Sequence, residues 1–273
     1  MHRVSVSGII TYPVKSLAGV SLPESEVLRT GLRLDRCWAV VNSDGEIITG
    51  REHPKLLGIS IEVQETFLQL TAPDGQLYQL TLYPAGEEMV EIRLFKRIVR
   101  GISLGSEAAH WFSNYLGVPC SLVMLGEQGR EMQAKYGGKE GDIVSYADTS
   151  PLHVVSEESL AELNTRLASP VLMHRFRPNI VVQGCQPYEE DQWKYIRIGD
   201  CEFEVNEHCK RCVFTTIDPV LQQKDEQQEP LRTLSAYRKN AAGAVTFGVN
   251  LIPRKLGTLQ VGQKIEVLTE RTW

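Results

Sequence analysis

The chain has 273 residues, of which 42% are hydrophobic and 23% are charged, and its formal net charge is −5. This composition is typical of a globular protein that buries about 70–75% of its unfolded surface in one large or two smaller domains. The negative charge, without a basic tail or stripe, argues against a general nucleic-acid binder. No apolar run approaches the roughly 18–20 residues of a membrane span.

The N-terminus enters strand-like sequence at once, which leaves no room for a signal peptide. The six cysteines show no obvious pairing, and with the lack of an export signal this indicates the reducing cytoplasm. We therefore expect a cytoplasmic protein whose partners include neither nucleic acid nor a membrane.

The first part of the sequence predicts a series of short strands. They are expected at 4–12, 37–41, 47–49, 57–63, 67–71, 78–82 and 90–95, with hairpin turns at Asp44-Gly45 and Asp74-Gly75. Strands this short and regularly spaced favour an antiparallel sheet or barrel. A helix follows, capped by Ser106 and ended by Gly117 and Pro119.

The second part begins after a boundary near 119–129, and the polar, glycine-rich segment 126–142 is predicted to be a loop beside a site. Ser156 is expected to cap a second helix and Pro230 to begin a third. Further strands are expected at 152–155, 180–182, 195–198, 201–205, 213–217, 247–250 and 259–268. The predicted fold class is mostly β with about three helices (α+β), divided into domains 1–122 and 123–273.

The segment 206–219 carries the most reactive side chains, because it contains the Cys-x-x-Cys pair of Cys209 and Cys212. We expect a turn at the mouth of a strand, in which Lys210 and Arg211 favour the thiolate of Cys212. A thiolate attacks electrophiles or ligates soft metals. The pair alone is a weak motif, since no second pair completes a zinc ribbon and a thioredoxin-type pair opens a helix.

Cationic and hydroxyl side chains recur at predicted strand ends and in the adjoining loops. In an acidic protein this pattern suits a small ligand with a phosphate or sulfate group, because each charge-assisted contact contributes about 1.5–3 kcal/mol. Spacing does not show that these side chains converge, and each one taken singly is compatible with a solvated surface residue. They are Lys15, Ser16, Arg36, Thr149, Ser150, Arg177, Lys210 and Arg211.

The sequence also resembles the MOSC superfamily in five motifs that occur in the expected order. The first three are Tyr12-Pro13-Val14-Lys15-Ser16, Asp35-Arg36 before a strand, and Phe176-Arg177-Pro178-Asn179-Ile180-Val181. The other two are Cys209-Lys210-Arg211-Cys212-x-x-Thr215-Thr216-x-Asp218-Pro219 and Phe247-Gly248-x-Asn250. The similarity covers nearly the whole chain and extends to YcbX-type bacterial proteins and mitochondrial amidoxime-reducing components. It implies a MOSC N-terminal β-barrel domain packed on a MOSC β-barrel domain.

The resemblance implies a molybdenum cofactor, in which the molybdopterin dithiolene holds the metal and one protein thiolate is a further ligand. The matching position is Cys212, which becomes the predicted metal ligand and catalytic residue. Asp218 is a candidate proton-handling group, although turn formation before Pro219 explains it equally well. Mitochondrial relatives carry tyrosine at position 250, so the contact at Asn250 departs from theirs. The residues implied to contact the pterin or its phosphate are Lys15, Ser16, Arg36, Thr149, Ser150, Arg177, Asn179, Lys210, Arg211 and Asn250.

By resemblance, the reaction is the two-electron reduction of a small N-hydroxylated substrate, such as a hydroxylamine, an amidoxime or an N-hydroxylated base analogue. YcbX-type proteins often end in a cysteine-rich ferredoxin domain, whereas this sequence ends at Trp273 without one. Electrons are therefore expected from a separate donor protein of the ferredoxin, flavoprotein or cytochrome type. Two alternatives stay open: sulfur transfer through a Cys212 persulfide, and a cofactor carrier without turnover.

Overall fold

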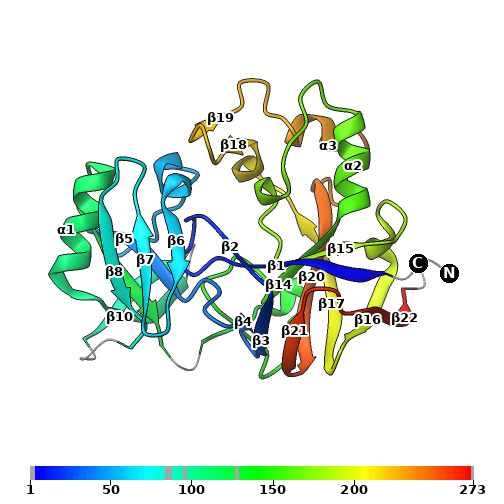
Figure 1. Ribbon diagram of the computed structural model, residues 1–273, viewed down its shortest axis with the longest axis horizontal. Coiled ribbons are helices and arrows are strands. Elements are labelled where there is room, and N and C mark those ends of the chain that lie inside the picture. The colour runs from blue at the N-terminus through cyan, green and yellow to red at the C-terminus, as the bar shows by residue number, and fades with distance from the viewer. Residues whose placement is uncertain (1–3, 84–87, 95–96, 127–128, 272–273) are drawn as a thin grey trace.

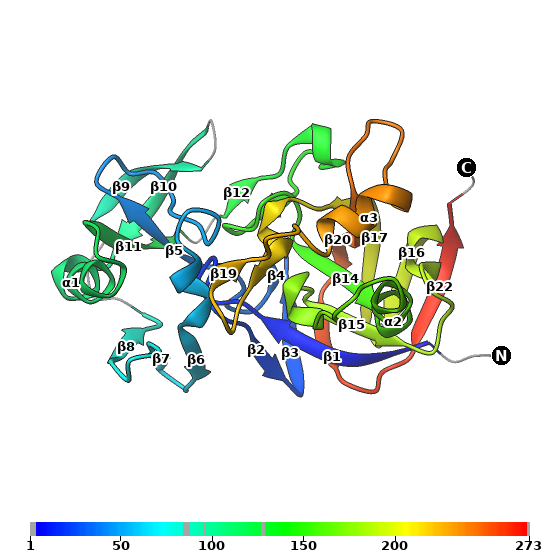
Figure 2. The same cartoon turned by 90° about the horizontal axis from the view of Figure 1, so that it is seen from above.

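The computed structural model describes residues 4–83, 88–94, 97–126 and 129–271. These residues form two halves of mainly β structure, seen left and right in Figure 1 and from above in Figure 2. The fold class is therefore confirmed as mostly β with a few helices. Among the described residues, no helix has the length and apolar character needed to cross a membrane.

The first half is built from antiparallel sheets with the strand orders β5-β11-β10-β9 and β6-β7-β8. Helix α1 (Gly105–Leu116) packs against β8 and β11 and buries Ala108, Phe112 and Leu116 in a core shared with Trp38. The strands are β5 Trp38–Asn42, β6 Ser60–Val63, β7 Phe67–Thr71, β8 Leu77–Thr81, β9 Met89–Leu94, β10 Arg97–Ser103 and β11 Cys120–Leu125, with a 3-10 helix at Pro54–Gly58.

The second half contains a large mixed sheet with the strand order β2-β1-β15-β14-β20-β17-β16-β22. Its core includes the fully buried Val154, Ile180, Phe203 and Leu251. Its later strands are β14 Leu152–Ser156, β15 Ile180–Gln183, β16 Trp193–Ile198, β17 Cys201–Lys210, β20 Thr246–Lys255 and β22 Ile265–Glu270. This half also contains helices α2 (Glu157–Thr165) and α3 (Leu231–Tyr237). Two short two-stranded sheets complete it: β12 (Arg130–Glu131) pairs with β13 (Ile143–Val144), and β18 (Ile217–Asp218) pairs with β19 (Gln223–Lys224).

The N-terminal strands cross into the second half. Strand β1 (Ser5–Thr11) pairs antiparallel with β15, and β3 (Glu24–Leu28) pairs with β21 (Gly257–Gln260) and with β4 (Gly31–Leu32). Strand β2 (Val20–Leu22) extends the same sheet beside β1. The chain thus enters the second half before it builds the sheets of the first, and the division into 1–122 and 123–273 stays a prediction.

The helix caps follow the predictions in most places. Ser156 accepts a hydrogen bond from the Ser159 amide at the start of α2, and Gly117 ends α1 with a φ of 76°. Helix α3 begins directly after Pro230. The predicted cap at Ser106 is wrong, because α1 begins at Gly105 and Ser106 lies in its first turn.

Three predicted strands are wrong. The segment 47–49 forms no strand, since Ile47 makes only an isolated bridge to Val41. The segment Val213–Thr216 is a 3-10 helix, and only Ile217–Asp218 is extended. The hydroxyls of Thr215 and Thr216 donate to the carbonyls of Cys212 and Val213, and this local bonding outweighs the β propensity of the side chains. The segment 259–268 is interrupted by a turn at 261–262, so it forms the end of β21 and the start of β22. The end of the strand predicted at 90–95 lies outside the described residues.

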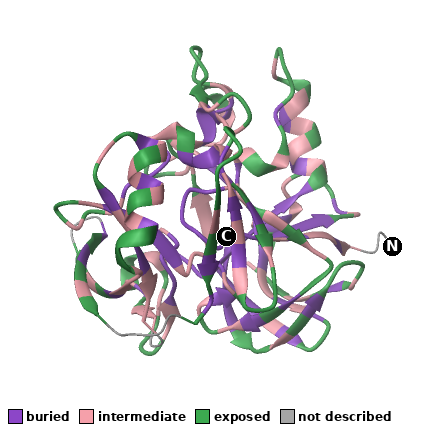
Figure 3. Cartoon of the chain, turned by 60° about the vertical axis from the view of Figure 1, so that its left-hand side comes forward, coloured by how far each residue is buried: buried purple, intermediate pink, exposed green. Residues whose placement is uncertain are grey.

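Figure 3 shows buried residues along the inner strands and exposed residues on the outward faces of the helices and at loop ends. The largest fully buried side chains include Trp38 and Phe112 in the first half and Trp193 and Phe203 in the second. Tyr12, which is 1% exposed, follows β1. The alternating apolar residues of the sequence therefore build separate cores, with the segments after β1 running between them.

The segment predicted as a loop beside a site folds back onto the sheet. We call residues 130–142 the Tyr136 turn, since the 3-10 helix Ala134–Tyr136 lies within it. Its far end is held by charge, because Arg254 of β20 contacts both Asp142 and Glu204 of β17. Glu204 also accepts from Lys139 at 2.7 Å and from Lys194 at 3.2 Å. This network ties the Tyr136 turn to β17 and β20.

The Glu204 network predicts a defined loss of stability in acid. Burial would raise the pKa of Glu204, but hydrogen bonds from Lys139, Arg254 and Lys194 lower it to about 2. A folded-state pKa below the unfolded value contributes stability that is complete above pH of about 4.5 and is lost as the pH falls towards about 2. We expect Glu204→Gln to lower the free energy of unfolding by about 2–3 kcal/mol at pH 7 and by less at pH 3, measured by urea denaturation.

Glu266→Gln is the matched control, because Glu266 forms an ion pair with Arg197 in which the two side chains are 63% and 41% exposed. Loss of such an exposed pair changes stability by less than about 1 kcal/mol. A Glu204→Gln effect of equal size at pH 7 and pH 3 would contradict the assignment.

Candidate functional site

A cavity of about 360 Å³ opens where the two halves meet. Each residue predicted to bind a cofactor contributes to its wall, and so does Cys212. A cavity of this size is within the range of small-molecule and cofactor sites. The predicted residues in the wall are Lys15, Ser16, Arg36, Thr149, Ser150, Arg177, Asn179, Lys210, Arg211, Cys212 and Asn250.

The sheet order explains why residues so distant in sequence meet. Strands β1, β15, β14, β20 and β17 are consecutive neighbours in the large sheet. Lys15 follows β1, Arg177 precedes β15 and Ser150 precedes β14, so their loops leave the sheet at one edge. Asn250 lies within β20, opposite both His153 of β14 and Glu207 of β17.

The backbone is strained at three of these positions. Ser16, Arg36 and Arg177 have φ values of 71°, 50° and 55°, in the left-handed region that residues with a Cβ avoid. Strained residues of this kind persist only where the surrounding structure holds them, and they gather at functional sites. Their side chains are all directed to the same cavity wall.

A buried carboxylate organises the inner end of the cavity. Asp35, which is 1% exposed, accepts from the Tyr12 amide and the Asn179 side chain at 2.9 Å each, and from Arg36 at 2.6 Å. Asn179 in turn accepts from Arg36 at 3.2 Å. These contacts join the segment after β1, the segment before β5 and the segment before β15 into one unit.

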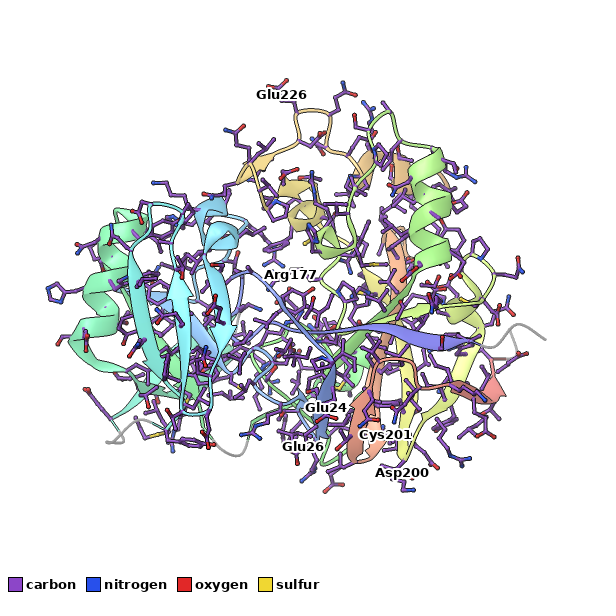
Figure 4. The ribbon with its side chains drawn as sticks, viewed as in Figure 1. Glu24, Glu26, Arg177, Asp200, Cys201 and Glu226 are labelled. Atoms are coloured by element: carbon purple, nitrogen blue, oxygen red, sulfur yellow. The ribbon has the colours of Figure 1, made fainter. Side chains whose placement is uncertain are left out.

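The two arginines at this end share an aromatic face. The guanidinium carbons of Arg36 and Arg177 lie 4.5 and 4.1 Å from the centre of the Tyr12 ring. Burial lowers the pKa of Arg177 to about 10 and raises the pKa of Tyr12 to about 12, so at neutral pH the arginine is charged and the phenol neutral. Figure 4 shows Arg177 in the region where the two halves meet.

Buried donors in this wall suit an anionic group. Within the described residues, Arg177 Nη2 and Arg211 Nε are buried and have no hydrogen-bond partner. Unsatisfied buried donors cost free energy, and a bound anion satisfies them. In the part of the chain that the structure describes, no group of three or more His, Cys, Asp or Glu side chains is arranged to hold a metal by itself. The unpaired donors of Arg177 and Arg211 therefore fit a phosphate-bearing ligand.

Sequence reasoning missed Asp148 and Arg51. Asp148 forms ion pairs with Lys15 and, at 2.7 Å, with Arg51. Burial would raise the pKa of Asp148, but Lys15 and Arg51 outweigh it and hold that pKa well below its usual range. Asp148 therefore stays ionised and fixes both cations. Asp148 directly precedes the predicted residues Thr149 and Ser150, and this position could have indicated that it belongs to the site. Nothing in the sequence near Arg51 indicated that this residue belongs to the site.

The two cysteines have different surroundings from those predicted. Arg211 donates to the Cys209 sulfur at 2.9 Å, and Lys210 pairs with Glu207 at 3.1 Å, so neither flanking cation is committed to Cys212. Burial raises the pKa of the Cys209 thiol despite Arg211. Cys212 is exposed.

The cation that faces Cys212 is instead Arg51. Burial would lower the pKa of this arginine, but Asp148 and the Cys212 sulfur raise it overall. A residue of the first half of the chain thus supplies the positive charge that we had expected from the immediate neighbours of the cysteine.

The remaining predicted residues form a polar wall. Asn250 donates to the Thr149 hydroxyl at 3.1 Å and to Glu207 at 3.3 Å. Asn206 donates to the Ser150 hydroxyl at 2.9 Å. Further wall residues that sequence reasoning did not assign are Thr49, Tyr136, His153, Phe176, Glu207 and Phe214.

Asp218 lies apart from the described cavity wall. Its carboxylate pairs with Arg175 at 2.8 Å and accepts from the amides of Val220 and Leu221 at 2.8 and 2.9 Å. These are the contacts of a turn-forming residue, and a part for Asp218 in proton handling stays a prediction.

Comparison with known proteins agrees with this architecture. Residues 3–119 match the MOSC N-terminal beta barrel domain and residues 141–266 match the MOSC domain. The chain is 37% identical to mitochondrial amidoxime reducing component 2 of Rattus norvegicus, 36% to mitochondrial amidoxime-reducing component 1 of Mus musculus and 35% to component 2 of Homo sapiens. These alignments cover 96–97% of this chain and 82% of each relative.

The fold and the cavity therefore define a two-part MOSC protein. Within that class, the chain belongs to the family that includes the mitochondrial amidoxime-reducing components. The predicted family and its N-terminal and MOSC domains are confirmed.

Gly248 of the last motif is expected to be indispensable for this wall. Its φ is 72°, and a Cβ at this position would lie 2.4 Å from the Val154 carbonyl oxygen and 2.7 Å from His153 Nε2. We expect Gly248→Ala to lower the free energy of unfolding by at least about 2 kcal/mol, measured by denaturant unfolding, because it combines backbone strain with a steric clash.

Gly243→Ala separates these two effects. Gly243 has a φ of 78° and nothing within 4 Å of an added Cβ, so only the backbone cost applies. Equal losses of stability in the two variants would show that the contact with β14 is unimportant.

Proposed function

We propose that this chain is a molybdenum-cofactor-dependent reductase of N-hydroxylated compounds that receives electrons from a separate donor protein. The observation that carries the proposal is the cavity in which strained, partly buried cationic residues meet the exposed Cys212. The names of the relatives support the same reaction class, since these proteins are called amidoxime-reducing components.

The wall residues suggest how the cofactor would be held. Arg36, Arg177 and Ser16 would bind its phosphate, with Lys15 and Asn179 beside them. The buried unpaired donors of Arg177 and Arg211 support this assignment. When bound through the Cys212 thiolate, the cofactor supplies a metal centre that exchanges two electrons and accepts oxygen.

The protein's own part is orientation and charge. Reduction of R–NH–OH consumes two electrons and two protons and yields R–NH2 and water. Asp148, held ionised by Lys15 and Arg51, would keep these cations in place. Glu207 accepts hydrogen bonds from Lys210 and Asn250 in the wall, and it would hold both side chains in position.

The approach of an electron donor is favoured on the Cys212 side. Cys212 is exposed, and the exposed apolar side chains of Val213, Val220 and Leu221 follow it along the chain, at 37%, 76% and 67% exposure. A ferredoxin, flavoprotein or cytochrome would dock there, close to the metal ligand.

The exposed thiol of Cys212 also favours a second candidate function. A persulfide on an exposed cysteine would be open to attack by an acceptor, so Cys212 could act in sulfur transfer. This alternative requires labile sulfur in place of stoichiometric molybdenum.

The two functions are separated by the molybdenum content of protein expressed in a cofactor-competent host, measured by elemental mass spectrometry. We expect near one molybdenum per chain, and a loss of at least about 90% of the reductase activity in Cys212→Ser, because the nearly isosteric hydroxyl is a poor ligand for a soft metal. Cys209→Ser should lose less, since Arg211 rather than metal is the partner of that sulfur.

Full reductase activity in Cys212→Ser would eliminate this residue as the ligand. Equal losses in the two variants would mean that the thiols act as a pair. Labile sulfur without molybdenum, after reconstitution with cofactor has been attempted, would favour the sulfur-transfer function. Circular dichroism and thermal unfolding of each variant exclude misfolding as the cause.

A further inference from the structure

We propose that Arg130 is a positioning residue that holds the buried segment 145–148 and thereby aims the Asp148 carboxylate at the cations of the cavity. Arg130 itself lies outside the described cavity wall, whereas Asp148 is part of that wall. Neither the motifs nor the comparisons assign a role to Arg130. Its effect on turnover rests on the proposed reductase function, whereas its hold on the segment does not.

The segment 145–148 is a stretch of irregular backbone inside the protein. It lies between β13 and β14 and belongs to neither a helix nor a strand. Ser145 and Tyr146 are 0% exposed, and Ala147 is 7% exposed. A buried carbonyl that has no hydrogen-bond donor costs free energy. The carbonyls of this segment therefore need donors from outside the regular secondary structure.

Arg130 supplies most of these donors. It lies in β12 opposite Val144 of β13, the residue directly before the segment. Its Nε donates to the Ser145 carbonyl at 2.7 Å. Its Nη2 donates to the carbonyls of Ala147 and, at 3.3 Å, of Asp148. One guanidinium thus binds three of the four carbonyls of the segment.

Lys15 binds the same segment from the cavity wall. It donates to the Tyr146 carbonyl at 2.7 Å and pairs with the Asp148 carboxylate. The same carboxylate pairs with Arg51 at 2.7 Å. Asp148 is therefore held at its backbone by Arg130 and at its side chain by two cations of the wall. If Arg130 were removed, carbonyls of the segment would lose their donor, and a shift of the backbone would carry the carboxylate away from both cations.

The charge and the shape of the guanidinium both contribute to this hold. Burial lowers the pKa of Arg130 to about 10, although the charge of Asp148 opposes this shift, so the side chain is charged at neutral pH. A charged donor forms stronger hydrogen bonds than a neutral one. The planar fork of an arginine binds several acceptors in fixed directions, whereas a lysine carries a single ammonium group. Lysine at this position would therefore replace the charge but only part of the hydrogen bonding.

The hold on the segment is tested by hydrogen–deuterium exchange mass spectrometry on the whole chain without added cofactor. We expect Arg130→Ala to raise the exchange rate of the amides in 145–150 by at least about tenfold, because the segment opens locally when its carbonyls lose their donor. The amides of β14 and β15 should keep their wild-type rates. Faster exchange throughout the sheet would make Arg130 a residue of general stability, and unchanged exchange in 145–150 would show that it does not hold the segment. Both results overturn the inference.

Arg97→Ala is the matched control for this measurement. Arg97 is an exposed arginine of β10 that also donates to a carbonyl of β12, that of Glu131, at 3.4 Å. Because this carbonyl belongs to an exposed residue, its loss of a donor should leave the exchange rate in 145–150 within about twofold of the wild type. In Arg130→Lys the rate should lie between those of the wild type and Arg130→Ala.

Turnover tests whether this hold reaches the site. The molybdenum-loaded protein is assayed with benzamidoxime, with reduced methyl viologen as the electron source so that no donor protein is needed. We expect Arg130→Ala to lower kcat per bound molybdenum by about tenfold and to leave KM within about twofold, because the cations fixed by Asp148 lose their orientation. Asp148→Asn should cause a loss of similar size. The loss in the double variant should stay at about tenfold, since Arg130 acts through Asp148, whereas independent effects would multiply to about 100-fold.

The inference and the proposed function fail in different ways. Wild-type protein that holds molybdenum but does not reduce benzamidoxime would refute the reductase assignment, and the exchange rates alone then decide whether Arg130 holds the segment. An active wild type with an unchanged kcat in Arg130→Ala, or with a loss of about 100-fold in the double variant, would refute the positioning role and leave the reductase assignment intact. An equal loss of kcat in Arg97→Ala would also refute it.

Discussion

The buried carboxylate of Asp35 is the constraint on which the rest of the site depends. It holds the Tyr12 amide, the Arg36 guanidinium and the Asn179 amide group, which belong to three segments of chain around the strands of both halves. Without this charge, Arg36 would be buried with no carboxylate beside it, which proteins tolerate poorly. The pairing of β1 with β15 and the inner wall of the cavity are therefore parts of one arrangement.

A cavity lined by several cations must limit their mutual repulsion. Asp35, Asp148 and Glu207 are carboxylates that pair with them, and the Tyr12 face lies under two guanidiniums. The compensation is incomplete, since donors of Arg177 and Arg211 stay unpaired among the described residues. An anionic ligand that satisfied these donors would gain free energy, and this supports the proposed cofactor. The positive φ values of Ser16, Arg36 and Arg177 occur in the same wall.

Much of the fold was predictable because its signals are local. The neighbouring strands β16 and β17, the Ser156 cap and the Gly117 stop depend on residues close in sequence, and all were predicted. The strand expected at 213–217 was wrong because threonine hydroxyls form hydrogen bonds to nearby carbonyls that β propensity does not describe. Strand β20 extends from Thr246 to Lys255 because it pairs with β14 and β17. The sequence pattern predicted a strand only at 247–250 and so underestimated its length.

The sequence by itself predicted part of the cavity wall, from Lys15 to Asn250, through motifs that resemble those of one family. Only the tertiary structure decided which charge faces which group. Arg51 reaches Asp148 across 97 residues of chain and faces Cys212, while the cations adjacent to that cysteine turn to Glu207 and Cys209. Tyr136 likewise enters the wall because Asn206 and the Glu204 network fold its turn back. Contacts of this kind depend on strand order and side-chain direction, which spacing along a chain does not encode.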